Sequence, residues 1–264
     1  MLRALARERA MRPAGARPWI AYDKDGYPID EPSTYDTSGC PWVPYVESHW
    51  TEIRDELLRA IERQEETLLP YPDPEKTNRP KAWRTAGLMY WTFASDRYAR
   101  VFPRTWEILS KIPHLTSASL LLLEPNSTIK PHVGDTNAMF RCHLGLIVPA
   151  PAPRCGFRVR DTVLSWEEGK IFMFNDAHEH TAWNNTAEPR YILSFDVMRP
   201  EFRGMERWVA TSVLGNIYFD VVSQRHAAVR QLRRLPGGEP VLRKMSQALF
   251  HVLSVTGRPL YNLL

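Results

Sequence analysis

The sequence predicts a mainly β protein with flanking helices, and two observations support this. Between residues 115 and 197 the chain consists of short apolar segments separated by turn residues, whereas the segments on either side have apolar residues at helical spacing. Many short strands at close spacing are typical of a sandwich or barrel. We therefore predict a double-stranded β-helix, the jelly-roll or cupin-like architecture, as the core.

Two helices are expected before the strands. Residues 46–66 carry Trp50, Ile53 and Leu57 on one helical face. A second helix is expected over residues 102–111, ending before Pro113, because the residue before a proline is unfavourable for helix.

The expected strands are bounded by proline- and glycine-containing turns at 124–127, 149–156 and 167–170. They cover residues 118–123, 140–148, 156–159, 171–174 and 191–197.

Helical spacing returns after Pro200, over residues 208–222, 228–234 and 241–255, with a break at Pro236–Gly238. We divide the chain into a disordered tail at 1–18, a jelly-roll domain with its N-terminal helices at 19–205, and a helical C-terminal extension at 206–264.

Charge and cysteine content exclude several classes of protein. Residues 1–18 carry a net +4 and residues 201–264 a net +5, so the total of +4 leaves −5 for the rest of the chain. The basic excess is therefore confined to the ends, no nucleic-acid motif accompanies it, and we expect no nucleic-acid partner. Three widely spaced cysteines suggest neither a disulfide framework nor a zinc cluster, and favour a cytoplasmic protein.

Two histidine-containing segments stand at the edges of predicted strands. They are IKPHVGDTN (129–137) and NDAHEHTAW (175–183), and their histidines His132 and His180 are 48 positions apart. That separation is too long for a pair on one helix but suits two strands of a rolled sheet. Imidazole binds iron, zinc, copper and nickel, so the metal is open on these grounds alone. His178, beside the second segment, is expected to face solvent.

The stretch 129–202 resembles the aspartyl/asparaginyl β-hydroxylase family. The shared elements are HxGxTN, RxHLGL, a Trp-x-x-Gly-Lys turn, (N/D)D-x-x-x-H-x-x-W, an arginine ten residues after that histidine, and a terminal D-V-x-x-P. The resemblance is good over roughly residues 90–202 and looser over 46–89. It implies an oxygenase that uses Fe(II), 2-oxoglutarate and O2.

The resemblance also implies roles for individual residues. His132 and His180 match the iron ligands, and Arg190 matches the residue that pairs with the distal carboxylate of 2-oxoglutarate. Arg141 and His143 match residues that line the cosubstrate and substrate pocket. These two are two positions apart on a predicted strand and share a face, so the intervening Cys142 is expected in the core.

Two positions depart from common patterns. Many iron oxygenases have a carboxylate two residues after the first histidine, where this chain has Gly134, so the third metal ligand is either water or the neighbouring Asp135. Family members also use a serine near the distal carboxylate. The matching position here is Leu121, and we expect Ser119 to substitute for that serine.

The substrate is the least determined feature. Asn137, Arg84 and Trp91 are candidates for substrate contacts, and the first could equally cap a turn. The resemblance suggests hydroxylation at the β-carbon of an aspartyl, asparaginyl or related amino-acid unit, free, peptidyl or carrier-bound. The alternatives are hydroxylation of a lipid acyl chain and a non-catalytic metal-binding module. The basic, partly amphipathic C-terminal extension could contact a membrane surface, or serve as a lid or a dimer surface.

Overall fold

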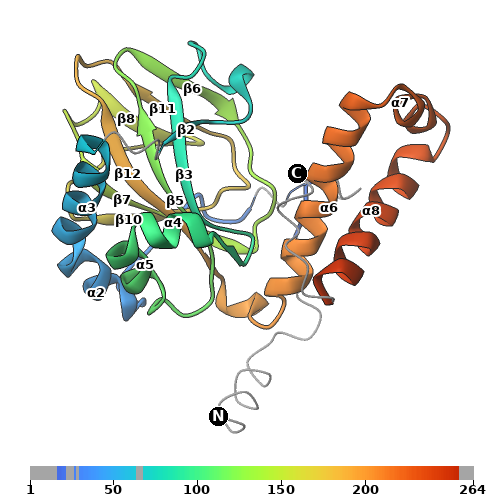
Figure 1. The fold of residues 1–264 in the computed structure, drawn as a ribbon, viewed down its shortest axis with the longest axis horizontal. Coiled ribbons are helices and arrows are strands. Elements are labelled where there is room, and N and C mark those ends of the chain that lie inside the picture. Colours follow the sequence, from blue (N-terminus) through green and yellow to red (C-terminus); the bar gives the residue numbers. More distant parts are fainter. Residues whose placement is uncertain (1–16, 22–26, 28–29, 64–67, 256–264) are drawn as a thin grey trace, which may run out of the picture.

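Two antiparallel sheets face each other in the computed structural model, which describes residues 17–21, 27, 30–63 and 68–255 (Figure 1). The larger sheet has the order β1-β10-β7-β12-β5-β3-β2 with β4 beside β3, and the smaller sheet has the order β6-β11-β8-β9. The strands of the larger sheet are β1 (Thr34–Tyr35), β2 (Leu69–Pro70), β3 (Trp83–Tyr90), β4 (Phe93–Ala94), β5 (Leu115–Leu123), β7 (Met139–Ile147), β10 (Ile171–Phe174) and β12 (Arg190–Met198). Those of the smaller sheet are β6 (Ser127–His132), β8 (Cys155–Val159), β9 (Thr162–Leu164) and β11 (His180–Asn184).

The chain passes back and forth between the two sheets from β5 to β12. Strands β5, β7, β10 and β12 lie in the larger sheet, and β6, β8, β9 and β11 lie in the smaller one. Within these eight strands, sequence neighbours pair directly only at β8 and β9. This is the connectivity of a jelly roll, so the predicted fold class is confirmed.

The larger sheet is buried on both faces, and this explains the nearly continuous apolar run in β5. Ala118 and Leu120 contribute to a core cluster under the N-terminal helices, while Leu121 and Leu123 point between the two sheets. A strand covered on both sides needs apolar residues at consecutive positions.

The outer face of the larger sheet is covered by helices α2 (Trp42–Ser48), α3 (Trp50–Glu62), α4 (Asp96–Val101) and α5 (Pro103–Leu109) (Figure 1). Ile53 and Leu57 of α3 are fully buried there, and burial of each such side chain contributes roughly 1.5–3 kcal/mol. Glu56 of α3 accepts hydrogen bonds from the backbone N–H groups of Arg104 and Thr105, and thereby caps the start of α5.

Three C-terminal helices form a hairpin beside the barrel: α6 (Glu206–Arg225), α7 (Ala227–Arg233) and α8 (Gly238–Val255) (Figure 1). Helix α6 packs on the barrel edge through Val209 and Val213. It also approaches α8 closely, because a Cβ at Gly215 would lie 2.6 Å from the Cα of Gln247. No helix in the described ranges has both the length and the apolar character to cross a bilayer.

The structure differs from the sequence prediction in several elements. The single helix expected at 46–66 is two helices, separated at His49, whose backbone is not helical. Helix α4 and strands β3, β6 and β11 were not predicted, because their sequences lack a clear apolar period. Pro131 is tolerated in β6 because that strand is an edge of the smaller sheet. The expected tail falls outside the described residues up to position 16.

Candidate active site

The two candidate metal ligands lie side by side on paired strands. His132 ends β6 and His180 begins β11, and the two are direct partners in the antiparallel ladder. Their ring centroids are 4.2 Å apart. The sheet therefore brings together two residues that are 48 positions apart in the sequence.

The hydrogen bonds of both histidines define their tautomers. Nδ1 of His132 lies 2.8 Å from the carbonyl oxygen of Lys130, and Nδ1 of His180 lies 2.9 Å from that of His178. A carbonyl can only accept, so Nδ1 carries the proton and Nε2 keeps its lone pair in each ring. Burial lowers the pKa of both imidazoles, which keeps them neutral. The site thus offers two neutral Nε2 donors, the form that binds metals.

Asp176 occupies the space that a side chain at position 134 would need. A Cβ built on Gly134 would lie 1.6 Å from Oδ2 of Asp176, and the Gly134 N–H donates to the Asp176 carbonyl at 2.7 Å. Oδ1 of the same carboxylate is 3.4 Å from Nε2 of His180. Asp176 was not among the predicted site residues, although it stands four residues before His180 in the second histidine segment.

No group of three histidine, cysteine, aspartate or glutamate side chains assembles as a ready metal cluster in the described ranges. Asp135 therefore does not join the two histidines as a third ligand in this arrangement. Its backbone carbonyl instead accepts a hydrogen bond from Ala21 at 2.7 Å.

Arg141 of β7 is fixed by two buried carboxylates. Its Nε and Nη2 donate to the two oxygens of Asp196 at 2.8 and 2.9 Å, and its Nη1 donates to Asp176. The fork-shaped pairing with Asp196 is bidentate, the geometry that guanidinium groups favour. Arg141 thereby holds Asp176 in place beside His180.

Arg190, the first residue of β12, is a buried cation for which the described residues provide no counter-ion. Its exposed fraction is 1%, and its Nε and Nη1 have no hydrogen-bond partner among the described residues. Burial lowers its pKa to about 10, so it stays protonated at neutral pH. Its guanidinium carbon lies 4.4 Å from the centre of the Trp166 ring. A buried, unpaired cation is costly unless an anion binds to it.

His143 of β7 differs from the two candidate ligands in its tautomer. The indole N–H of Trp166 donates to its Nδ1 at 3.3 Å, which leaves the proton on Nε2. Burial and the nearby Arg190 and Arg141 hold its pKa well below the ordinary value. His143 is therefore a neutral hydrogen-bond donor, whereas His132 and His180 present lone pairs.

These side chains meet in one cavity between the two sheets. Its volume is about 60 Å³, and the polar residues that line it are His132, Arg141, His143, His180, Thr181, Arg190 and Ser194. Aromatic residues, including Trp83 and Trp166, form much of the remaining wall. The cavity has the guanidinium of Arg190 at one point and the imidazoles of His132 and His180 at another. It can therefore accept a short anionic ligand that pairs with Arg190 and at the same time contacts a metal held by the two histidines.

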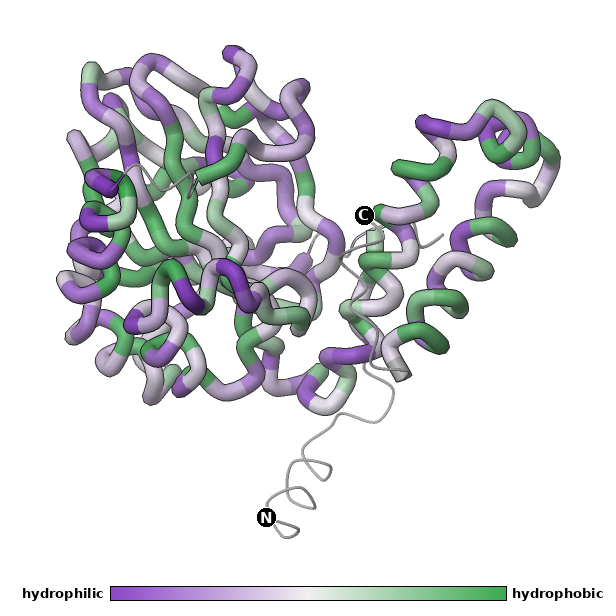
Figure 2. Tube along the Cα trace, in the orientation of Figure 1, coloured by the Kyte–Doolittle hydropathy of each residue, from purple (hydrophilic) through white to green (hydrophobic). Residues whose placement is uncertain are grey.

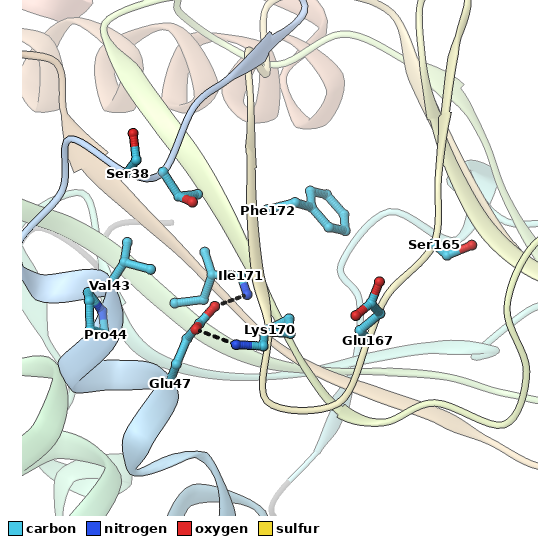
Figure 3. Close-up of a pocket in the computed structure, with 10 residues that line it drawn as sticks. Ser38, Val43, Pro44, Glu47, Ser165, Glu167, Lys170, Ile171 and Phe172 are labelled. Carbon is cyan, nitrogen blue, oxygen red and sulfur yellow. Dashed lines mark hydrogen bonds and ion pairs between the residues drawn. The ribbon is translucent and has the colours of Figure 1, made fainter.

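A larger cavity of about 510 Å³ lies elsewhere, between the start of α2 and the turn before β10 (Figure 3). Glu47 spans it, pairing with Lys170 at 3.0 Å and accepting from the Ile171 N–H at 2.9 Å. None of the histidines lines this cavity, so the smaller cavity is the candidate active site.

A family model described as aspartyl/asparaginyl beta-hydroxylase matches residues 47–200, more than half of the chain. The chain belongs to this family. The resemblance inferred from the motifs is confirmed, and the match contains both histidines and Arg190.

The names of two relatives of this β-hydroxylase family member indicate different substrates for those relatives. The ornithine lipid ester-linked acyl 2-hydroxylase of Rhizobium tropici is 36% identical over 177 residues, covering 65% of this chain and 62% of that protein. The human aspartyl/asparaginyl beta-hydroxylase is 28% identical over 197 residues, covering 73% of this chain and 24% of that protein. The chain thus spans less than two thirds of the length of either relative. Among solved structures, a Pseudomonas putida prolyl-4-hydroxylase matches 60% of this chain and 100% of its own with a TM-score of 0.41 and 11% identity.

Ser119 does not accompany Arg190 in this family member, contrary to our expectation. It lies on the inner face of β5 opposite Ser194, whereas Arg190 pairs with Leu123, four residues further along the same strand. Four residues of strand span about 13 Å, and Ser119 is not part of the cavity wall. Leu121 does line the cavity, so no serine of β5 stands beside the arginine.

The three substrate candidates also lie outside the β-hydroxylase cavity. Arg84 faces the outer side of β3 and pairs with Glu124 at 3.6 Å. Trp91 is 4% exposed and packs in the cluster under α6. Asn137 accepts from the Trp19 N–H at 2.8 Å and donates to Glu31 at 2.9 Å, so it anchors the N-terminal segment. The structure thus does not bring these three residues together with the histidines, because strand direction and long-range contacts decide their placement, and their role in substrate binding stays a prediction.

His178 was expected to face solvent but is buried. Its Nε2 lies 2.8 Å from the carbonyl oxygen of Glu31, and its ring packs against Tyr27. Its own carbonyl accepts from His180. It therefore links the N-terminal segment to one of the candidate metal ligands. Cys142, expected in the core, is fully buried in the cluster under the helices.

Proposed function

We propose that this chain is an iron(II)- and 2-oxoglutarate-dependent dioxygenase that hydroxylates an unactivated C–H bond. The observation that carries the proposal is the buried Arg190 cation in the same cavity as two neutral imidazoles, with two nitrogen atoms that find no partner among the described residues. A dicarboxylate that also chelates a metal would satisfy both features at once.

The side chains fit this pair of ligands. His132 and His180 would hold iron through Nε2, and the nearby carboxylate of Asp176 favours a cation there. Arg190 would grip the distal carboxylate of 2-oxoglutarate, and the Nε2 proton of His143 is available to donate to a ligand oxygen. Once bound, the iron supplies the activation of O2 that protein side chains cannot perform. The aromatic walls exclude water from the reacting groups.

The cosubstrate proposal is tested by calorimetry of 2-oxoglutarate binding in the presence of Mn²⁺. Replacing Arg190 by Met removes two charge-assisted hydrogen bonds and is expected to weaken binding by about 100-fold or more. Arg158→Met, on the exposed side of β8 where the arginine pairs with Glu179, serves as the matched control and should bind normally. Equal affinities in both variants would sink the assignment of Arg190.

Turnover is tested by succinate formation from iron(II), ascorbate and 2-oxoglutarate. Wild-type protein should form succinate slowly without substrate, and His132→Ala and His180→Ala should not. Metal-dependent 2-oxoglutarate binding without any succinate, with or without candidate substrates, would instead indicate a non-catalytic binding module.

For the substrate, we propose the β-carbon of an aspartyl, asparaginyl or related amino-acid unit, following the family description. The acyl chain of a lipid is the second candidate, because the lipid acyl hydroxylase is more similar in sequence than the human relative. The two are separated by adding either an aspartate-containing peptide or an acylated amino-acid lipid in detergent micelles. The compound that belongs to the correct substrate class should accelerate succinate formation. Mass spectrometry should then show that this compound has gained one oxygen atom.

A further inference from the structure

Helix α8 presents an apolar row to solvent. Val241, Met245, Leu249 and Val252 are 57%, 63%, 46% and 61% exposed. Their spacing of four, four and three residues places them on one face of the helix. The opposite face packs against α6 through the fully buried Phe250. The apolar character of α8 is visible along the helix in Figure 2.

The apolar surface continues into the turn that precedes α8. Leu232 of α7 is 49% exposed and Leu235, just after α7, is 57% exposed. These six side chains account for most of the large apolar side chains that are strongly exposed in the described part of the chain. Apolar side chains gathered in this way mark an interaction surface rather than a scattered set. We refer to Leu232, Leu235, Val241, Met245, Leu249 and Val252 as the hairpin surface.

The charges of the hairpin that remain without an ion pair among the described residues are all positive. The acidic side chains of the described hairpin are already occupied: Asp220 and Glu239 pair with Arg233 and Arg243, and Glu206 pairs with His114. Five other Arg and Lys side chains of the hairpin are exposed and form no ion pair within the described residues; they are Arg207, Arg225, Arg230, Arg234 and Lys244. Arg230 and Arg234 alternate with Leu232 and Leu235 in sequence, and Lys244 borders the apolar row by helical spacing.

We propose that the hairpin surface docks on the face of an anionic phospholipid bilayer. The apolar row enters the boundary between headgroups and acyl chains, and the unpaired cations contact the lipid phosphates. This arrangement is that of a helix lying in the membrane interface. Each Lys or Arg near an anionic leaflet strengthens such binding through the negative surface potential of the lipids.

A second copy of the chain fits this surface less well. In a two-fold dimer the same patch meets itself, which would bring the unpaired cations of both copies together without a carboxylate to neutralise them. An anionic leaflet supplies the missing charge. Docking on the bilayer depends only on the exposed apolar and basic side chains of the hairpin, and it does not require the proposed dioxygenase reaction.

The test uses the full chain, without metal or cosubstrate, in flotation with vesicles. One set is phosphatidylcholine alone and the other contains phosphatidylglycerol as well. Binding is expected to the second set, and raising the salt concentration should weaken it. The double variant Met245→Ser, Leu249→Ser should lower the vesicle affinity by about tenfold or more, because two inserted side chains are lost. Val163→Ser, which alters an exposed valine on β9 at 54% exposure, is the matched control and should bind like wild type.

Melting temperatures within a few degrees of wild type would show that the variants remain folded. No flotation with phosphatidylglycerol vesicles at low salt would overturn the proposal, as would equal binding by the double variant. Light scattering would instead detect a dimer whose population rises with protein concentration. If the wild type forms such a dimer, the double variant does not, and neither binds vesicles, the hairpin surface would be assigned to contact with a second copy of the chain. Because flotation omits iron and 2-oxoglutarate, its failure is distinguishable from failure of the proposed dioxygenase activity.

Discussion

The Trp166 ring lies against the Arg190 guanidinium, with 4.4 Å between the guanidinium carbon and the ring centroid. The same indole donates its N–H to Nδ1 of His143 at 3.3 Å. One side chain thus fixes the orientation of a buried cation and the tautomer of a buried imidazole. Trp166 is therefore a positioning residue for both proposed cosubstrate contacts.

Replacing Trp166 with Leu should weaken 2-oxoglutarate binding. Loss of a desolvated cation–π contact of about 0.5–2 kcal/mol corresponds to roughly a 2- to 30-fold rise in Kd. Trp166→Phe keeps a ring face for Arg190 but no N–H for His143, and should show a smaller rise. Phe172→Leu removes a ring that packs on Trp166 and on His143 and serves as the control for the packing of the aromatic group. If Phe172→Leu weakened binding as much as Trp166→Leu, the effect would belong to the packing of the aromatic group.

Gly134→Ala should disturb the metal site. The added Cβ would overlap the carboxylate of Asp176, and overpacking of this kind costs about 1–3 kcal/mol. We expect a lower melting temperature and weaker Mn²⁺ binding, measured by calorimetry. Adding Asp176→Ala to this variant removes the overlap with the carboxylate but leaves the carbonyl oxygen of residue 176 at 2.9 Å and removes one ion pair of Arg141, so only part of the stability should return. Gly39→Ala, where a Cβ meets nothing within 4 Å, should be neutral.

Arg141→Met should lower the free energy of unfolding by about 3–5 kcal/mol, because it leaves the buried carboxylates Asp176 and Asp196 without their cation. Urea denaturation measures this loss. The double variant Arg141→Met, Asp196→Asn removes one of the stranded charges and should be more stable than the single variant. If the free energy of unfolding of the single variant fell by less than about 1 kcal/mol, the ion pairs of Arg141 with Asp176 and Asp196 would contribute no more than solvent-exposed ion pairs do.

The buried His143 should make stability depend on pH below about 6.5. Its pKa is well below the ordinary value in the folded protein and near 6.5 when unfolded. On acidification the unfolded chain therefore takes up a proton that the folded chain refuses, and the free energy of unfolding falls by up to about 1.4 kcal/mol per pH unit. His143→Gln removes this component, so its stability should fall less steeply than that of wild type between pH 6.5 and 5. Parallel curves for the two proteins would contradict the assignment.

The fold could be predicted because its strands have distinct apolar runs. β7, β10 and β12 were predicted to within one or two residues at each end, since each is dense in leucine, isoleucine, valine or phenylalanine. Strand β11 (HTAWN) has no such run, and its pairing with β6 is what creates the histidine pair. His132 and His180 were predicted as metal ligands from the motif resemblance, whereas their position side by side follows from the pairing of β6 with β11.

The remaining parts of the site depend on register and on contacts distant in sequence. Ser119 and Leu121 differ by two positions on one face, and only the pairing of β5 with β12 decides which of them stands nearer Arg190. Asp176 has a role only because Gly134 leaves room for it, a relation between two loops that no local pattern expresses. The lack of a partner for Arg190 among the described residues likewise depends on which side chains the fold packs around it.

The contacts between the start of the chain and the histidine loops also affect the order of folding. Glu31 accepts hydrogen bonds from Asn137 and from Asn175, which stand 106 and 144 positions away. At a synthesis rate of roughly 5–20 residues per second, Glu31 leaves the peptidyl-transfer centre about 7 to 30 seconds before Asn175 is made. The closure of such long loops is slow and entropically costly. The N-terminal segment therefore cannot form these bonds until most of the jelly-roll domain has been synthesised, and its contacts with the histidine segments are excluded from any earlier stage of folding on the ribosome.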